Sequence, residues 1–180
     1  MKRKSLSVTK KTLNFYLKKL KDPQVRKLYS LFSNNLASMD LTNKKIMVGV
    51  SGGADSLAVL FFSQCYALKH HTKLYPVIID HKLRKESTIE AKNLKYKLKQ
   101  NFKINCKILS KKIVKINKNI QSYARDLRYD LFFEECNKQK IDYLILGHHK
   151  DDLIENFFIR FLRGSGLKGL VSFDKNVSDY

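Results

Sequence analysis

Residues 46–60, IMVGVSGGADSLAVL, decide the fold of this chain. The apolar run at 46–50 predicts a buried strand, and the segment at 51–56 turns the chain into an apolar helix. Glycines let the backbone approach a ligand closely, and the first amides of a helix point into the same space. Those amides and the helix dipole favour an anion. The pattern therefore predicts a phosphate-binding loop, whose residues are Ser51, Gly52, Gly53, Ala54, Asp55 and Ser56.

This loop is not of the Walker type, because G-x-x-x-x-G-K-[ST] is absent and no lysine follows the glycines. SGGADS instead resembles the S-G-G-x-D-S loop of ATP pyrophosphatases, which activate a substrate by adenylation. Asp55 disfavours a bare phosphate, so it indicates either a bound Mg²⁺ or a backbone contact. The alternative is an ordinary Gly-Ser turn between a strand and a helix.

Length and composition predict a protein with a substantial core. The chain has 180 residues, of which 43% are hydrophobic. It has no apolar run of membrane-spanning length and no secretory signal, so we expect a soluble cytoplasmic protein; the basic start leaves an organelle stroma or matrix open. Cys65, Cys106 and Cys136 show no spacing typical of a disulfide framework, a zinc site or an iron–sulfur site.

The positive charge is concentrated in two blocks. Residues 1–45 hold twelve Lys and Arg against two acids (+10), and residues 81–118 hold thirteen against two (+11), out of a net charge of +20. Segregation of this kind favours a polyanionic partner, with nucleic acid the leading candidate. The alternative is a lysine-rich composition without selection for binding.

Hydrophobic periodicity predicts an α/β fold. Strands are expected at 46–50, 74–79, 104–109 and 141–146, with helices between them, which predicts an open parallel sheet flanked by helices. A capping box, Ser87 to Glu90, predicts a helix reaching about residue 101. Two further helices, 9–21 and 23–37, form a basic extension (1–45) before the main domain (46–180). Polar clusters at 51–56, 80–84 and 147–152 then meet at one edge of the sheet.

Four segments together resemble the tRNA(Ile)-lysidine synthetase family, within the PP-loop ATP pyrophosphatase superfamily. They are VGVSGGADSLAVL from Val48, IIDHKLRKES from Ile78, NIQSYARDLRYDLF from Asn119, and LGHHKDDLIENFFIRFLRGSGLKGL from Leu146. Four motifs in the expected order are far more specific than the loop alone. The resemblance implies a PP-loop fold like that of the adenine-nucleotide alpha hydrolases.

The resemblance also implies a reaction. ATP would adenylate the C2 oxygen of the wobble cytidine of an isoleucine tRNA with a CAU anticodon, releasing pyrophosphate. The ε-amine of free L-lysine would then displace AMP and leave lysidine. ATP and Mg²⁺ are the implied cofactors, tRNA and lysine the implied partners, and a homodimer is an expected assembly.

Site residues follow from the matched motifs. Residues 51–56 would hold the triphosphate, while Asp55 and Asp152 would hold Mg²⁺. The remaining nucleotide contacts are expected from Asp80, His81, Arg128 and His148. Asp55, Asp152, Arg125 and His149 are the expected catalytic residues. The carboxylate for the substrate lysine stays open among Asp80, Asp126 and Glu155.

Three alternatives remain. A tRNA cytidine thiolase shares the loop and a G-H-H-x-D-D segment, but normally carries a C-x-x-C pattern, which this chain lacks. ATP-dependent amidotransferase synthetases lack the DHKLR and LRY combination. The third is a non-catalytic RNA-binding remnant, since the chain ends ten residues after GSGLKGL, where the family's tRNA-gripping domains are expected.

Overall fold

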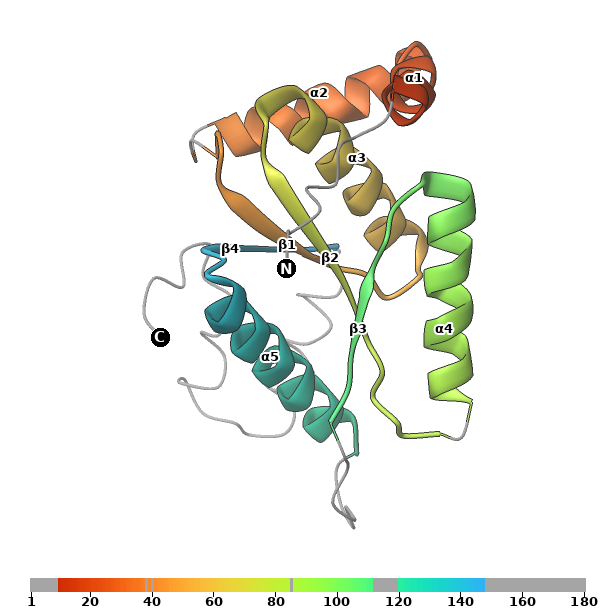
Figure 1. Cartoon of the computed structure of the whole chain (residues 1–180), viewed down its shortest axis with the longest axis vertical. Coiled ribbons are helices and arrows are strands. Elements are labelled where there is room, and N and C mark those ends of the chain that lie inside the picture. The colour runs from red at the N-terminus through yellow and green to blue at the C-terminus, as the bar shows by residue number, and fades with distance from the viewer. Residues whose placement is uncertain (1–9, 38, 40, 85, 112–119, 148–180) are drawn as a thin grey trace, which may run out of the picture. The chain divides into compact units, whose positions relative to one another are not determined.

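Four parallel strands form the sheet, in the order β3-β2-β1-β4 (Figure 1). The computed structural model describes residues 10–37, 39, 41–84, 86–111 and 120–147. Those up to Leu146 belong to one compact unit, and a second unit begins at Gly147. The strands are β1 (Lys45–Gly49), β2 (Lys73–Ile79), β3 (Lys107–Leu109) and β4 (Tyr143–Leu146). The predicted open parallel sheet is thereby confirmed.

Helices connect the strands and cover both faces of the sheet. They are α1 (Lys10–Lys19), α2 (Pro23–Ala37), α3 (Ala54–His70), α4 (Ser87–Lys97) and α5 (Ile120–Gln139), and a π-helical turn, η1 (Leu98–Phe102), continues α4. Within the part of the chain that the structure describes, no helix is both long and apolar enough to cross a bilayer.

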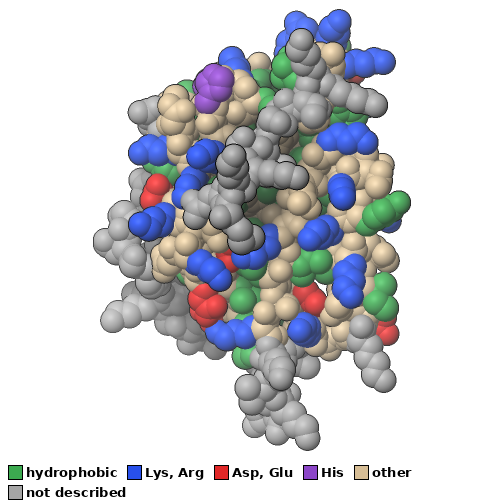
Figure 2. All heavy atoms as spheres, viewed as in Figure 1, with side chains coloured by type: hydrophobic (Ala, Val, Ile, Leu, Met, Phe, Trp, Pro, Cys, Tyr) green, Lys and Arg blue, Asp and Glu red, His purple; other side chains and the backbone are tan. Residues whose placement is uncertain are grey.

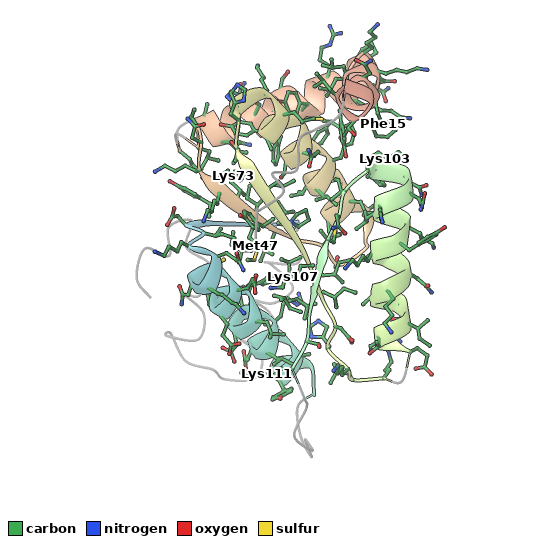
Figure 3. The ribbon with its side chains drawn as sticks, in the orientation of Figure 1. Phe15, Met47, Lys73, Lys103, Lys107 and Lys111 are labelled. Carbon is green, nitrogen blue, oxygen red and sulfur yellow. The ribbon has the colours of Figure 1, made fainter. Side chains whose placement is uncertain are left out.

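Alternation along β1 separates two hydrophobic cores. Ile46, Val48 and Val50 pack on the face covered by α3 and α4, together with residues such as Leu60 of α3. Met47 faces the other way and packs with Phe132 of α5 (Figure 3). Successive strand residues point to opposite faces, so a strand buried on both faces must be apolar throughout. The unbroken apolar run that predicted this strand is explained by that double burial.

Gly49, at the end of β1, makes room for the second core. A Cβ atom placed there would lie 2.5 Å from Leu146 Cδ2 and 2.6 Å from Phe132 Cζ. The side chains of β4 and α5 therefore occupy the space that any larger residue would need. Sequence reasoning did not single out this glycine.

The N-terminal helices share the core of the sheet. Tyr16 of α1 is 1% exposed, and it packs in the same cluster as Leu36, Leu41 and Ile46. Its hydroxyl donates a hydrogen bond to the carbonyl of Phe102, at the end of η1. The division at residue 45 stays a prediction, but within the described residues it does not separate two cores.

Two local predictions are corrected. Only Lys107–Leu109 pair with β2, although the strand was expected from residue 104; Ile104 and Cys106 are buried in the core without joining the ladder. The capping box does not form: Glu86 is the N-cap and makes no side-chain cap, while Ser87 Oγ accepts from the Arg84 amide and Glu90 pairs with the Arg84 guanidinium. Of the sequence segments quoted above, Lys85, Asn119 and the residues after Gly147 lie outside the described residues.

Candidate functional site

The order of the strands reverses beside β1. The chain adds β2 and then β3 on one side of β1, and returns to place β4 on the other side. Open α/β sheets bind ligands at the carboxyl ends of the strands where this reversal occurs. Residues 50–53 leave β1 at that edge, and Gly147 follows β4. The predicted phosphate loop is therefore at the topological switch point.

Backbone conformation in the loop depends on Gly52. Its φ is +93°, a region that side-chain-bearing residues rarely adopt. A Cβ atom there would also lie 3.2 Å from Leu94 Cδ2 of α4. Gly53 is extended (φ −71°, ψ 161°) and precedes the first residue of α3 without a side-chain cap. The first turn of α3 thus begins immediately beyond the turn at Gly52, as a phosphate-binding helix start requires.

Ser56 ties the loop together from inside. It is 3% exposed, and its Oγ donates to the Gly53 carbonyl at 2.9 Å. The same Oγ accepts from the Gly52 amide and from Ser51 Oγ, both at 3.1 Å. Both serine hydroxyl protons thus have protein acceptors, so the amides of the first turn of α3 are the donors this arrangement offers to an anion. Contact of Ser51 and Ser56 with a triphosphate stays a prediction.

Asp55 is exposed in the first turn of α3, next to those amides. A carboxylate oxygen is the ligand type that Mg²⁺ prefers, so this residue suits the metal role expected of it. Its expected companion, Asp152, lies outside the described residues, as do His148 and His149. Among the residues with a described placement, no group of three His, Cys, Asp or Glu side chains could hold a metal ion.

Asp80 fixes the loop that follows β2. It is 3% exposed; its Oδ1 accepts from the Lys82 amide at 3.0 Å, and its Oδ2 accepts from Thr88 Oγ1 at 2.7 Å. Lys82 has φ +50°, so the loop turns sharply where Asp80 holds it. Each carboxylate oxygen already accepts one hydrogen bond, which makes Asp80 a positioning residue for this loop. Direct contact with ATP or lysine stays a prediction.

His81, in the loop after β2, is close enough to Arg128 of α5 to be affected by its charge. Burial and the positive charge of Arg128 lower the pKa of His81, against a smaller opposing effect of Asp80. Burial lowers the pKa of Arg128; the phenol of Tyr129 opposes this and the positive charge of Arg125 adds to it. Arg125 and Arg128 lie three residues apart on α5, so their side chains are neighbours on the helix surface. The Nδ1 atom of His81 is buried without a protein hydrogen-bond partner among the described residues.

Helix α4 connects the two groups of predicted site residues. Its Thr88 binds Asp80 in the loop after β2, and its Leu94 packs over Gly52 in the phosphate loop. Sequence reasoning missed both residues as parts of the site. Thr88 lies within the expected capping box and Leu94 is an ordinary apolar residue of the helix, so no signal in a single sequence distinguishes them.

The three cysteines are separated by the sheet. Cys65 and Cys106 lie in the core on the α3 and α4 side, whereas Cys136 lies in the core under α5. All three thiols are free and buried. Burial raises the pKa of Cys65 and that of Cys106 to about 12. Because the sheet lies between them, the three sulfur atoms cannot converge on one metal cluster within this chain.

Comparison with known proteins gives one family and several relatives. The family model described as PP-loop domain matches residues 20–179. A tRNA(Ile)-lysidine synthase of Orientia tsutsugamushi (strain Boryong) is 44% identical over 130 residues, covering 72% of this chain and 29% of that protein. Another from Rickettsia rickettsii (strain Sheila Smith) is 36% identical over 155 residues, covering 83% and 31%. The chain spans about a third of the length of these curated relatives.

A solved structure with a similar fold is a U34-tRNA thiolase, NcsA, from Methanococcus maripaludis, determined with its [4Fe-4S] cluster. The TM-score is 0.67 and the sequence identity 23%, and the match covers 93% of this chain and 57% of the thiolase. At this identity the likeness concerns the fold alone.

Proposed function

This chain belongs to the PP-loop domain family, and from that premise we propose that it is the adenylating part of a tRNA(Ile)-lysidine synthase. ATP would react with the C2 oxygen of the wobble cytidine, forming a bond to the α-phosphorus and releasing pyrophosphate. The neutral ε-amine of lysine would then attack C2 and release AMP. The observation that carries the proposal is the loop at 51–56, which turns at Gly52 and presents the start of α3 at the switch point.

The loop would act on the leaving pyrophosphate. Amides in the first turn of α3 are fixed donors, so they can stabilise negative charge as it develops without reorganising. Ser56 holds those amides in place through its bonds to Gly52 and Gly53. Asp55, with Asp152, would hold Mg²⁺, which when bound neutralises phosphate charge.

Cationic residues of α5 would act on the α-phosphate, where the new bond forms. The charge of Arg128 acts on both Arg125 and His81, and guanidinium groups bind phosphate oxygens in a bidentate manner. We assign them to phosphate oxygens around the α-phosphorus. His148 and His149 would contact phosphate or base. The lysine carboxylate partner remains open among Asp80, Asp126 and Glu155, and the cytoplasmic homodimer stays a prediction.

The positions of the cysteines favour lysidine formation over thiolation. A cluster-dependent thiolase needs several thiolates around one group of iron atoms. Here the three cysteines lie in cores on opposite faces of the sheet, and burial raises their pKa values. The similar fold of the thiolase from Methanococcus maripaludis therefore does not carry its chemistry to this chain.

The test combines ATP, labelled lysine and an isoleucine tRNA with the CAU anticodon. We expect lysine in the tRNA and one AMP released for each lysine incorporated. A tRNA with uridine at the wobble position is the substrate control. Ser56→Ala should lower the rate by loosening the loop, whereas Lys138→Ala, at an exposed site on α5, should leave it unchanged. Tight tRNA binding without AMP release would instead indicate a non-catalytic remnant, and sulfur incorporation in a parallel reaction supplied with sulfide would indicate a thiolase.

A further inference from the structure

The side of α4 that faces away from the core carries large apolar side chains beside lysines. We define the outer face of α4 as Ile89, Lys92, Asn93, Tyr96 and Lys97, all exposed. Ile89 is 60% exposed and Tyr96 65% exposed, and they lie two helical turns apart on the same side of α4. The opposite side of α4 packs into the core. An exposed tyrosine and isoleucine on one face are not needed for that packing.

The lysines of this face are not neutralised by acidic side chains among the described residues, so they can bind an anionic partner. Within the described residues, Lys92, Lys97 and the neighbouring Lys99 of η1 are exposed and form no ion pair. Lysines at and after β3 differ: Lys107 binds Glu135 at 2.7 Å and Lys111 binds Glu134 at 2.9 Å, both on α5 (Figure 3). Figure 2 shows Lys and Arg side chains spread over the side of the molecule that carries α4, with hydrophobic side chains among them.

We propose that the outer face of α4 binds RNA, with Lys92, Lys97 and Lys99 on the phosphates and Tyr96 stacked on an unpaired base. Aromatic rings between basic side chains are typical of surfaces that bind single-stranded nucleic acid. The inference rests on the proposed function, because it takes RNA as the substrate, and it adds where this domain holds that RNA outside the phosphate loop.

A membrane surface is the competing partner for an exposed basic helix. Helices that lie in a bilayer interface bury a continuous apolar face. Here the apolar face, Ala91 and Leu94 of α4 with Leu98 of η1, already packs in the core. The large apolar side chains of α4 that remain exposed are Ile89 and Tyr96. Nucleic acid is therefore the better match for this surface.

The experiment measures RNA affinity of the full chain by fluorescence anisotropy over a range of salt concentrations. The two probes are an RNA stem–loop and a blunt RNA duplex of the same length. Lys92→Ala/Lys97→Ala/Lys99→Ala should reduce the slope of log K against log salt by about two to three. A control, Lys69→Ala/Lys138→Ala/Lys140→Ala, removes three exposed lysines elsewhere and should leave the slope unchanged.

Tyr96 separates stacking from charge. Tyr96→Ala should weaken stem–loop binding by about 5- to 100-fold and leave duplex binding unchanged, because only an unpaired base can stack on the ring. Tyr96→Phe keeps the ring and should bind like the parent. A thermal unfolding curve of each variant verifies that the fold is intact.

The proposal is overturned if the two triple variants have the same slope, or if Tyr96→Ala weakens duplex and stem–loop equally. If the α4 triple variant lost binding to phosphatidylserine vesicles but bound RNA like the parent, the proposal would also be overturned, in favour of a membrane partner. Failure of lysine incorporation alongside a reduced slope for the α4 variant would sink only the proposed function. Lysine incorporation by the parent chain, with the same salt slope for the α4 and control variants, would disprove only the role of α4.

Discussion

Gly49 is a residue whose importance comes from its neighbours rather than from its own conformation. Leu146 and Phe132 approach the position of its missing Cβ to 2.5 and 2.6 Å. Alanine there must displace a side chain of β4 or α5, which are both packed in the second core.

Gly49→Ala should therefore lower the free energy of unfolding by about 1–3 kcal/mol, as overpacking does in a full core. Urea unfolding followed by circular dichroism measures the change. Gly53→Ala is the matched control, since the nearest atom to its added Cβ would be Ser51 Oγ at 3.8 Å. Equal effects of the two substitutions would contradict the packing argument.

His81 makes stability depend on pH. Burial and Arg128 lower its pKa in the folded protein below the ordinary value of 6.5. The unfolded chain therefore binds a proton more readily than the folded one, and the unfolding free energy decreases as pH falls below 6.5. The decrease stops once the pH is below the pKa of His81 in the folded state.

His81→Gln should remove this part of the acid sensitivity, which unfolding curves at several pH values between 7 and 5 would reveal. Arg128→Met should raise the pKa of His81 in an NMR titration, because it removes a nearby positive charge. Lys138→Met, on an exposed part of α5, is the control for loss of one charge. An unchanged pKa of His81 in the Arg128→Met variant would disprove the electrostatic effect of Arg128 on His81.

At the scale of elements, α4 is held to the end of β2 by one side-chain hydrogen bond. Thr88 Oγ1 donates to the buried Asp80 Oδ2 at 2.7 Å. Thr88→Val keeps the shape of the side chain but leaves that oxygen without its donor, which should cost about 1–3 kcal/mol of unfolding free energy. Thr88→Ser retains the hydroxyl and should lose much less.

The readout that goes beyond stability is nucleotide binding by isothermal titration calorimetry. Because α4 also packs over Gly52, we expect the valine variant to bind ATP more weakly than the serine variant. If valine and serine variants bound ATP equally while differing in stability, Thr88 would have a purely structural role.

Helices and strands were predictable where the local sequence strongly favoured one kind of structure. The apolar run of β1 and the helix start at Pro23 are found as expected, because burial on two faces and a proline at a first helical position leave few alternatives. The start of α4 was wrong in detail because both residues of the expected capping box, Ser87 and Glu90, interact with Arg84 instead. β3 was too long in the prediction because Ile104 and Cys106 are apolar for core packing, not for pairing.

Parts of the site were predictable to the same extent. The turn in the loop at 51–56 followed from its glycines, whereas its contact with phosphate stays a prediction. Arg125 and Arg128 are close because they lie three residues apart on α5. The internal use of the Ser56 hydroxyl, and the bridge that α4 makes between the two loops, depend on tertiary contacts. A single sequence carries no periodic signal for contacts of that kind.

At the scale of the whole molecule, the charge of +20 is the dominant property. One of its two basic blocks, residues 1–45, includes α1 and α2, whose helices pack on the same core as α3. Lys18 and Lys19 are exposed at the end of α1. If the extension holds tRNA phosphates, these lysines contribute to the salt dependence of binding.

Lys18→Ala/Lys19→Ala should reduce the slope of log K against log salt for tRNA by about one to two, as the loss of two phosphate contacts requires. The measurement is a filter-binding titration at several salt concentrations. Lys138→Ala/Lys140→Ala removes the same charge from the far end of α5 and should leave the slope as it is. Identical slopes for both double variants would show that the extension contributes nothing to phosphate contacts.

Because the three thiols lie on opposite sides of the sheet, the rate at which each is alkylated reports how often its own side opens. An alkylating reagent can reach Cys65 or Cys106 only when the layer of α3 and α4 opens, and Cys136 only when α5 lifts. Mass spectrometry of labelled peptides would thus time the two openings separately in the unaltered protein. Whether the layers loosen together or in turn becomes a question that three native sulfur atoms can answer.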